Sequence, residues 1–375
     1  MLERYAFKAQ QFEAIRLPQI EEKKGKQWID FGSNNLYPDL LIELYNNSAM
    51  HHTAVDAKVD GITGEGFKMF GDTFANSKGE TLDEVFAKIT LDYVLFGGYA
   101  LNVIWSRDGE TIAEFYHLPF NNVRSGVLTE DEEIEEYYYC TDWSKYRKHK
   151  PVAYPAFSRT DNEGDNASQI FYHYEYTVGN YYYPLPAYVG AINDIDTDAR
   201  ISRFHRSNLQ QGLAPSMMLT FKNGIPTADE QTAIWRDIEK TFAGEENAGK
   251  FFVNFSEPGR EPDLQAIENA NDDYYITLES RVTSRILTSH RISSPLLLGI
   301  KDASGFSNNA DEINTAYNHF MGTVIVPEQK KLLKSFNKIV NMTGKTVKLE
   351  IEPAEILYTV NVDGAPQDII ENNND

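Results

Sequence analysis

The chain has 375 residues, which is enough for two or three structural units with their own cores. Its 56 acidic and 35 basic residues give a formal charge of -21. This charge argues against tight nonspecific binding to nucleic acid, which needs clustered Lys and Arg to replace phosphate counterions. The single cysteine, Cys140, excludes an internal disulfide and a cysteine-based zinc cage, and predicts a reduced, partly buried thiol in a protein made in the cytoplasm. The chain opens without the apolar segment of a signal peptide, and no apolar run is long enough to span a membrane.

The first part of the chain is predicted to be helical. The first thirty residues are mixed and charged, which predicts an extended or mobile arm. Apolar residues at helical spacing then predict three helices, at residues 39–46, 48–61 and 81–96. The third opens with Thr81, followed three residues later by Glu84, which is the pattern of a capping box.

Antiparallel strands are predicted to follow these helices. Two apolar runs flank Asp108 and Gly109, a dipeptide that strongly favours a hairpin turn. The acidic segment at residues 129–136 separates this hairpin from an aromatic strand, and a second aromatic strand begins near residue 169. Helices followed by antiparallel strands indicate an α+β fold.

A helix is predicted at residues 188–211, and it is polar on nearly every side beyond Arg200. Such a helix is stable only when neighbours cover it through polar contacts or when it is exposed. A compact strand–helix–strand insert is predicted next, with its helix at residues 227–243 and a second capping box at Thr227 and Glu230.

Residues 272–341 contain two helical runs that are separated by a broken loop. The first run, residues 272–291, has apolar residues three and four apart, and the loop at 293–309 carries Pro295 and a Ser/Asn cluster. Helical periodicity resumes over residues 310–341 on both sides of Pro327, so this proline is expected to kink the helix. One or two strands and a disordered polar end are expected after this helix.

A nucleotide or metal site is not expected. Gly344, Lys345 and Thr346 match the end of a phosphate loop, but Ile339 stands where the earlier glycine is required. His51 and His52 are adjacent, so on a helix they point about 100° apart and cannot clamp one metal ion. They are expected to be surface or interface residues.

Three aspartates, Asp194, Asp196 and Asp198, resemble the opening of a calcium loop. Ala199 stands at the position of the turn glycine and His205 at that of the bidentate glutamate, so helix capping is the better interpretation. No catalytic serine or cysteine motif is present, and no carboxylate pair stands out among 56 acidic residues. We therefore expect no catalytic residue, no metal and no cofactor.

The order of features after residue 186 resembles the portal proteins of tailed bacteriophages, most closely the compact siphophage type. Three patterns carry the resemblance. A helix is followed by N-G-x-P, a G-x-x-N-A-G-K segment precedes a strand, and a P-x-L-L-G loop leads through S-N-x-x-D to a long helix with a central proline. The resemblance covers most of the chain and implies an α+β portal fold.

The resemblance also implies a role for each segment. In terms of the parts of a portal subunit, residues 1–187 correspond to the wing and residues 212–271 to the clip. Residues 188–211 and 272–292 correspond to the paired stem helices. Residues 293–309 become the tunnel loop, 310–343 the long wing helix kinked at Pro327, and 344–375 short strands and a tail. Portals commonly end in a helical crown, whereas strands are expected here, so the crown is reduced.

The resemblance implies that the chain assembles into a ring, usually of twelve subunits, at one capsid vertex of the virion. Its partners are other copies of the chain, the large terminase subunit, the capsid or scaffold protein, a neck or head–tail adaptor, and double-stranded DNA that passes without tight binding. The candidate DNA-channel residues are Lys301, Asp302, Ser304, Phe306, Asn308 and Asn309. The candidate docking residues on the clip are Asn223, Glu230, Arg236 and Glu239.

Two alternatives remain open at this point. A hydrolase could use carboxylates of the aromatic-rich strand region, and a tail or neck adaptor could share some of the motifs. An adaptor would lack the order of helix, clip, helix, loop and long helix.

Overall fold

The computed structural model describes residues 25–130, 133–162, 164–210, 217–221, 226–242, 251–255, 263–266, 272–300, 310–345 and 347–354. The chain divides into two compact units. Unit 1 comprises residues 1–193 and 285–375, and unit 2 comprises residues 194–284. Both units contain helices and strands, so the predicted α+β class is confirmed.

Three helices open the described part of unit 1, namely α1 (Tyr37–Asn47), α2 (Ala49–Thr63) and α3 (Leu82–Phe96). The predicted capping box of α3 is present, because the Thr81 hydroxyl accepts from the Glu84 N–H and the Glu84 carboxylate accepts from the Thr81 N–H. Gly97, with φ of 88°, ends α3 in the left-handed conformation that glycine adopts without strain. The three predicted helices are therefore confirmed, with ends shifted by a few residues.

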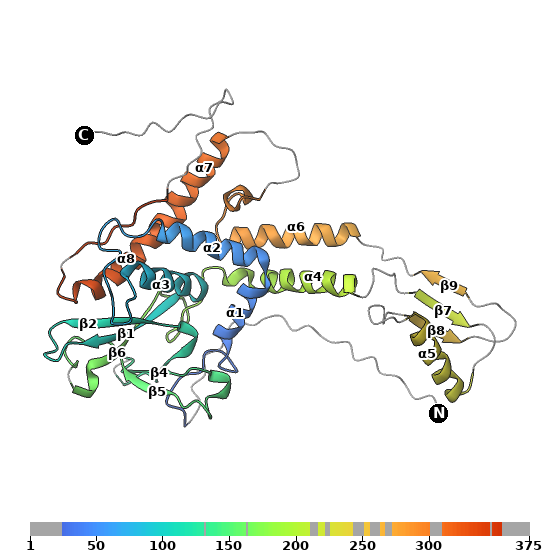
Figure 1. Ribbon diagram of the computed structural model, residues 1–375, viewed down its shortest axis with the longest axis horizontal. Coiled ribbons are helices and arrows are strands. Elements are labelled where there is room, and N and C mark those ends of the chain that lie inside the picture. The colour runs from blue at the N-terminus through green and yellow to red at the C-terminus, as the bar shows by residue number, and fades with distance from the viewer. Residues whose placement is uncertain are drawn as a thin grey trace. The chain divides into compact units, whose positions relative to one another are not determined.

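A three-stranded antiparallel sheet supports these helices, with its strands in the order β2 (Ile112–Leu118), β1 (Gly98–Trp105) and β6 (Ser168–Tyr174). The predicted hairpin around Asp108 and Gly109 is β1–β2. Helix α3 packs on β1 and β2, and α2 packs against α3 and α8 (Val326–Asn341) (Figure 1). The rings of Phe67, Phe86 and Phe336 meet in this core, with centroids 4.9 to 6.1 Å apart.

A second antiparallel sheet of unit 1 has the order β3 (Val123–Ser125), β4 (Glu136–Tyr139) and β5 (Val152–Pro155). Two short 3-10 helices adjoin its strands in the chain: η1 (Phe120–Asn122) precedes β3 and η2 (Trp143–Lys145) follows β4. A third, η3 (Gly164–Ala167), precedes β6 of the first sheet and contacts β1. Cys140 is buried next to β4, where its thiol lies within hydrogen-bond distance of the His149 and Asp142 carbonyls and can donate its one hydrogen to either. Burial raises the pKa of that thiol.

The described end of the N-terminal arm packs onto this second sheet. Ile29 and Phe31 are buried, and the Phe31 ring stacks on Tyr183 with centroids 4.0 Å apart. Trp28 forms a bridge to Gly126. Of the two expectations for this arm, extended or mobile, the mobile one is wrong for residues 25–30, because apolar side chains anchor them. Residues 1–24 lie outside the described part.

The C-terminal run of unit 1 is helical. After α6 (Asp272–Ser289) and the short 3-10 helix η5 (Pro295–Leu298), the chain forms α7 (Ala310–Phe320), a π-helical turn at Met321–Ile325, and α8. The long helix predicted at residues 310–341 is therefore observed, with a π-helical turn in its middle. Beyond it, the predicted strand is wrong for residues 347–354, which make one isolated bridge, Phe67 to Ile351. Residues 355–375 lie outside the described part.

Unit 2 contains a small sheet in the order β8 (Phe251–Phe255), β7 (Met217–Phe221) and β9 (Asp263–Ala266). Strands β7 and β8 are parallel and β9 is antiparallel to β7. A parallel pair needs a crossover connection, and α5 (Ala228–Phe242) provides it. The predicted strand–helix–strand order is observed; β9 was not predicted.

Candidate functional site

The elements that the sequence singles out are two helices and the small sheet between them in the chain. Helix α4 (Ile192–Gln210), which follows the 3-10 turn η4 (Val189–Ala191), leads into β7, and α6 leaves after β9. Figure 1 shows α4 and α6 running alongside each other. The predicted helices at residues 188–211 and 272–291 correspond to these two, and their roles as a stem remain predictions.

Helix α4 changes its surface along its length. Ile195 and Ala199, one helical turn apart, are buried, and the Arg200 guanidinium pairs with the Asp196 carboxylate at 2.6 Å. After Ile201, five consecutive side chains are exposed in the single chain: Ser202, Arg203, Phe204, His205 and Arg206. The polar surface predicted beyond Arg200 is therefore observed among the described side chains, and a neighbouring molecule could cover it through polar contacts.

Helix α6 has a narrow buried face. Val282 and Ile286 are buried one turn apart, as the apolar spacing predicts, whereas Ile276 is 66% exposed. The charged and hydroxyl side chains on the other faces are exposed, among them Glu279, Ser280, Arg281, Ser284 and Arg285. Both helices thus combine one buried stripe with a wide polar surface.

The C-terminal end of α6 is anchored in unit 1 by two buried histidines. His51 of α2 and His290 are both nearly inaccessible, and His51 Nδ1 lies 3.0 Å from His290 Nε2. Tyr188, just before η4, stacks on His290 and donates from its hydroxyl to the Leu95 carbonyl. The expectation of a surface position is therefore wrong for His51. His52, next in the chain, is half-exposed and stacks on Tyr45, so one of the two histidines lies where it was expected.

Burial and neighbouring charge hold both histidines neutral. Burial, with a smaller contribution from His52, lowers the pKa of His51 to about 3. Burial, with the charges of His51 and Lys58, lowers the pKa of His290 well below its ordinary value. In the neutral pair, one of the two facing ring nitrogens carries the hydrogen and donates it, and the other accepts.

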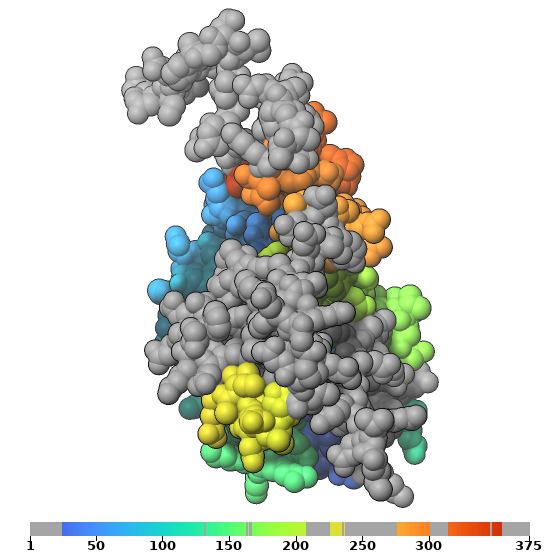
Figure 2. All heavy atoms as spheres, turned by 90° about the vertical axis from the view of Figure 1, so that its right-hand side faces the viewer, coloured from blue at the N-terminus to red at the C-terminus, as the bar shows by residue number. Residues whose placement is uncertain are grey.

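Two of the predicted docking residues lie on the described surface of α5. Glu230 accepts hydrogen bonds from the Thr227 N–H and hydroxyl, which lowers the pKa of Glu230. Arg236, six residues further along the helix, is exposed. Of the predicted capping box, the half in which the Glu230 carboxylate accepts from the Thr227 N–H is thus present. Figure 2 shows the described part of α5, in yellow, exposed at the surface. Asn223 and the side chain of Glu239 lie outside the described part.

The predicted DNA-channel residues, Lys301, Asp302, Ser304, Phe306, Asn308 and Asn309, all lie outside the described residues. The segments on either side are described. Ser294 caps η5, and Gly299 ends it with φ of 71°. Helix α7 begins at Ala310, so the connection that is predicted to face DNA is framed by a 3-10 turn and a helix.

Pro327 is the second residue of α8 and follows the π-helical turn directly. A proline has no N–H, so it leaves the carbonyl of Thr323, four residues earlier, without its usual helical donor. Arg291 supplies a donor, because its guanidinium donates to the Thr323 carbonyl at 2.9 Å. Sequence reasoning missed both the π-helical turn and this contact; the local signals were Gly322 and the run of β-branched residues Thr323–Val326 before the proline.

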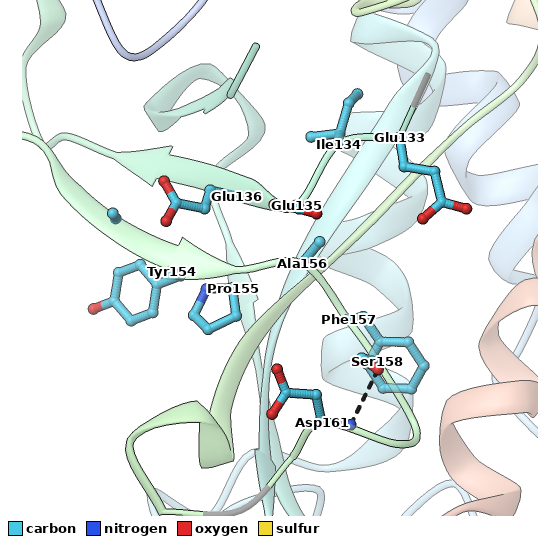
Figure 3. A pocket seen from close by; sticks show the side chains of 11 residues that line it. Glu133, Ile134, Glu135, Glu136, Tyr154, Pro155, Ala156, Phe157, Ser158 and Asp161 are labelled. Carbon is cyan, nitrogen blue, oxygen red and sulfur yellow. Dashed lines mark hydrogen bonds between the residues drawn. The ribbon is translucent and has the colours of Figure 1, made fainter. Parts of the chain in front are cut away.

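A groove of about 750 Å³ lies at the ends of β4 and β5 (Figure 3). Glu133, Glu136 and Asp161 stand on different sides of it rather than converging on one point. Glu136 accepts a hydrogen bond from the Tyr138 hydroxyl at 2.7 Å. This arrangement gives no support to carboxylate-based hydrolysis in the aromatic strand region.

Among the described residues, no group of three His, Cys, Asp or Glu side chains is placed to hold a metal ion. The described helices also include none that combines the length and apolar character needed to cross a membrane.

No family model matches the chain, and no curated protein matches it. Solved structures do match. A chain from the virion of a native gene transfer agent particle aligns over 84% of this chain and 82% of its own length, with a TM-score of 0.56 and 14% identity. A chain from the neck of the native particle, computed with C12 symmetry, aligns over 83% of both chains, with a TM-score of 0.52 and 15% identity.

The chain shares its fold with chains of a gene transfer agent neck. An HK97-family phage portal protein from Corynebacterium diphtheriae also aligns, over 80% of this chain and 88% of its own, at a TM-score of 0.46 and 9% identity. That last similarity is too weak to support a conclusion.

Proposed function

We propose that the chain is a portal subunit, which assembles with other copies into a ring at one vertex of a phage-like capsid. Double-stranded DNA enters and leaves the capsid through the ring. The observation that carries the proposal is the shared fold, over more than four-fifths of the chain, with chains of a particle neck, one of them from a reconstruction with C12 symmetry. The portal motifs of the sequence support the same class independently, and a ring of twelve is the expected form.

The polar surfaces of α4 and α6 fit subunits that cover one another in a ring. With 19 residues, α4 is about 28 Å long at 1.5 Å per residue, a length suited to crossing a capsid shell. A formal charge of -21 repeated around a ring makes a channel whose field disfavours adsorption of DNA. Weak adsorption allows DNA to slide. The role is that of a conduit, which needs neither a catalytic residue nor a cofactor.

The partners follow from this placement. The insert that contains α5 is proposed to dock the large terminase subunit during packaging and the neck or tail adaptor afterwards. Unit 1 is proposed to face the capsid or scaffold protein as the wing. Residues 301–309, which connect Ile300 to Ala310, are proposed to contact the moving DNA.

Native mass spectrometry and negative-stain imaging of the purified full chain test the proposal. We expect closed rings, twelve subunits in the commonest form, at micromolar protein concentration. The control is circular dichroism with a thermal melt, which establishes that the sample is folded. A folded protein that remains a monomer or dimer at high concentration contradicts the portal function.

A further inference from the structure

Two separate groups of large apolar side chains are exposed on unit 1. The first, here the turn patch, consists of Tyr176, Val178 and Tyr181 in the turn after β6, and these residues are 79%, 83% and 72% exposed. The turn is well formed, because Thr177 and Asn180 form a bridge and the Tyr174 hydroxyl donates to the Tyr181 carbonyl at 2.7 Å. Its side chains are therefore held outward by an ordered backbone.

The second group, here the loop patch, lies between α2 and α3. It consists of Met69, Phe70 and Phe74, which are 63%, 44% and 69% exposed. Phe70 has φ of 71°, a left-handed conformation that is costly for a large side chain. Such a conformation persists only where the surrounding structure holds it. The Thr73 N–H closes the turn by donating to the Phe70 carbonyl at 3.0 Å.

The two patches lie at opposite ends of α3. At its N-terminal end, Phe74 forms a bridge with Thr81, the residue that caps the helix. At its C-terminal end, the N–H of Glu175, just before the turn patch, donates to the carbonyl of Gly97. Helix α3 has 15 residues and is therefore about 22 Å long. Both ends belong to one compact unit, so this separation is fixed by the fold.

Each patch exposes apolar surface on the scale that marks a protein interface. Three large side chains at these exposures present roughly 300 to 400 Å² per patch. This is about the size of the largest apolar patch on a typical monomer, and such patches are often functional. A ring needs a heterologous interface, in which one surface of each copy meets a different surface of the next. Two unlike apolar patches at opposite ends of one unit meet this requirement.

We propose that the turn patch of one copy packs against the loop patch of the neighbouring copy in the ring. The inference rests on the proposed portal function and names the surfaces that hold unit 1 of each subunit to the next. Together the two patches supply roughly 700 Å², somewhat under half of a standard interface of ~1,600 Å². The remainder of the subunit contact comes from other surfaces, which the variants below leave intact.

The test uses two variants of the full chain and their mixture. The turn variant carries Tyr176→Ser, Val178→Ser and Tyr181→Ser, and the loop variant carries Met69→Ser and Phe74→Ser. Each variant alone should need at least tenfold more protein than the unaltered chain to form rings in native mass spectrometry. An equimolar mixture should give heterodimers, because the intact loop patch of the first meets the intact turn patch of the second.

Val152→Ser is the matched control, since Val152 is 52% exposed on β5 and belongs to neither patch. It should form rings at the concentration of the unaltered chain. Circular dichroism and melting temperature establish that each variant is folded. The inference is overturned if either folded variant forms rings at the protein concentration at which the unaltered chain does. It is also overturned if the mixture of the two variants stays monomeric. Neither result contradicts the portal function. Absence of rings from the unaltered chain overturns the portal function itself.

Discussion

His51 Nδ1 lies 3.0 Å from His290 Nε2, and this contact joins α2 to the residue that follows α6. Tyr188 contacts both rings from the segment that leads into α4. The chain leaves unit 1 after residue 193 and returns at residue 285, so both crossings lie within a few residues of this cluster. The cluster therefore lies within unit 1 beside both points at which the chain passes between the units.

We predict that stability falls as the pH falls from 6.5 towards 5. The folded-state pKa of His51 is about 3, below the ordinary value of 6.5, so the unfolded chain binds more protons in this range. The stability from this group is fully present above pH 6.5 and is lost as the pH falls towards 3. For one such histidine, the loss in the free energy of unfolding between pH 6.5 and pH 5 is about 1.6 kcal/mol. Thermal melts across this range measure it.

His51→Asn keeps a polar atom near the position of Nδ1 and removes the titration, so its melting temperature should depend less on pH. His319→Asn is the matched control, because His319 is exposed on α7. It should show the same pH dependence as the unaltered chain. Parallel pH profiles for His51→Asn and the unaltered chain would contradict the role assigned to the histidine pair.

Arg291 and Pro327 are predicted to be coupled through the carbonyl of Thr323. Arg291→Met removes the guanidinium that donates to this carbonyl, and we expect a loss of about 1 kcal/mol in the free energy of unfolding. In a Pro327→Ala background, the helix regains a backbone N–H that can donate to the Thr323 carbonyl. Arg291→Met should then lower the free energy of unfolding by less. Chemical denaturation of the four proteins of this double-mutant cycle gives the coupling energy. Equal costs in both backgrounds would show that Arg291 does not substitute for the missing N–H.

Much of the fold could be predicted because its signals are local. The capping box at Thr81 and Glu84 and the Asp108–Gly109 turn depend on residues a few positions apart, and both occur as expected. The order of the two helices and the insert was likewise visible from apolar spacing. The functional roles of these segments came from the portal resemblance and remain proposals.

The missed features depend on residues that are far apart in the chain. His51 and His290 are separated by 239 positions, so nothing near His51 indicated that a second histidine would bury it. Arg124 is similar, because a charged residue in a short strand predicts exposure, yet its partner Asn35 lies 89 positions away. In both cases a long-range hydrogen bond makes burial of a polar group tolerable.

Arg124 is predicted to hold the N-terminal segment on unit 1. Its guanidinium donates to the side chain and carbonyl of Asn35 and lies 4.8 Å from the centre of the Trp143 ring. Arg124→Met removes these charged donors from buried acceptors; the Asn35 side-chain oxygen keeps only the Phe31 N–H. We therefore expect a loss of about 3 kcal/mol or more in the free energy of unfolding. Hydrogen exchange should show faster exchange at residues 28–37. Arg107→Met, on the exposed hairpin turn, is the control and should change neither the free energy of unfolding nor the exchange rate at residues 28–37. An unchanged exchange rate in Arg124→Met would show that Arg124 does not hold the N-terminal segment.

Arg236 is predicted to take part in docking of the terminase or adaptor. Arg236→Glu reverses an exposed charge on α5 and should weaken capture of the large terminase subunit several-fold in a pull-down, while the rings remain intact. Glu230→Gln tests the second candidate, because glutamine can still cap the helix while the charge is lost. Arg107→Glu reverses a charge on unit 1 and serves as the control. Terminase capture equal to that of the unaltered ring in both α5 variants would show that α5 is not the docking surface.

Deletion of residues 301–306 is predicted to spare assembly and to impair handling of DNA. The deletion removes four of the six candidate channel residues, Lys301, Asp302, Ser304 and Phe306. The deleted residues lie in the chain between the end of α6 at Ser289 and the start of α7 at Ala310. If the segment serves only to contact DNA, as proposed, rings should form normally. The measurement is the amount of nuclease-resistant DNA in particles assembled with the variant, and we expect a clear loss.

A matched variant separates the length of this connection from its side chains. Replacing residues 301–306 by an equally long Gly/Ser sequence keeps the reach of the segment but removes the lysine, the aspartate and the phenylalanine. If the side chains touch DNA, this variant should lose DNA as the deletion does; if only the reach matters, it should package normally. Failure of the deleted chain to form rings would make the segment an assembly element, because a loop that only contacts DNA contributes nothing to the contacts between subunits.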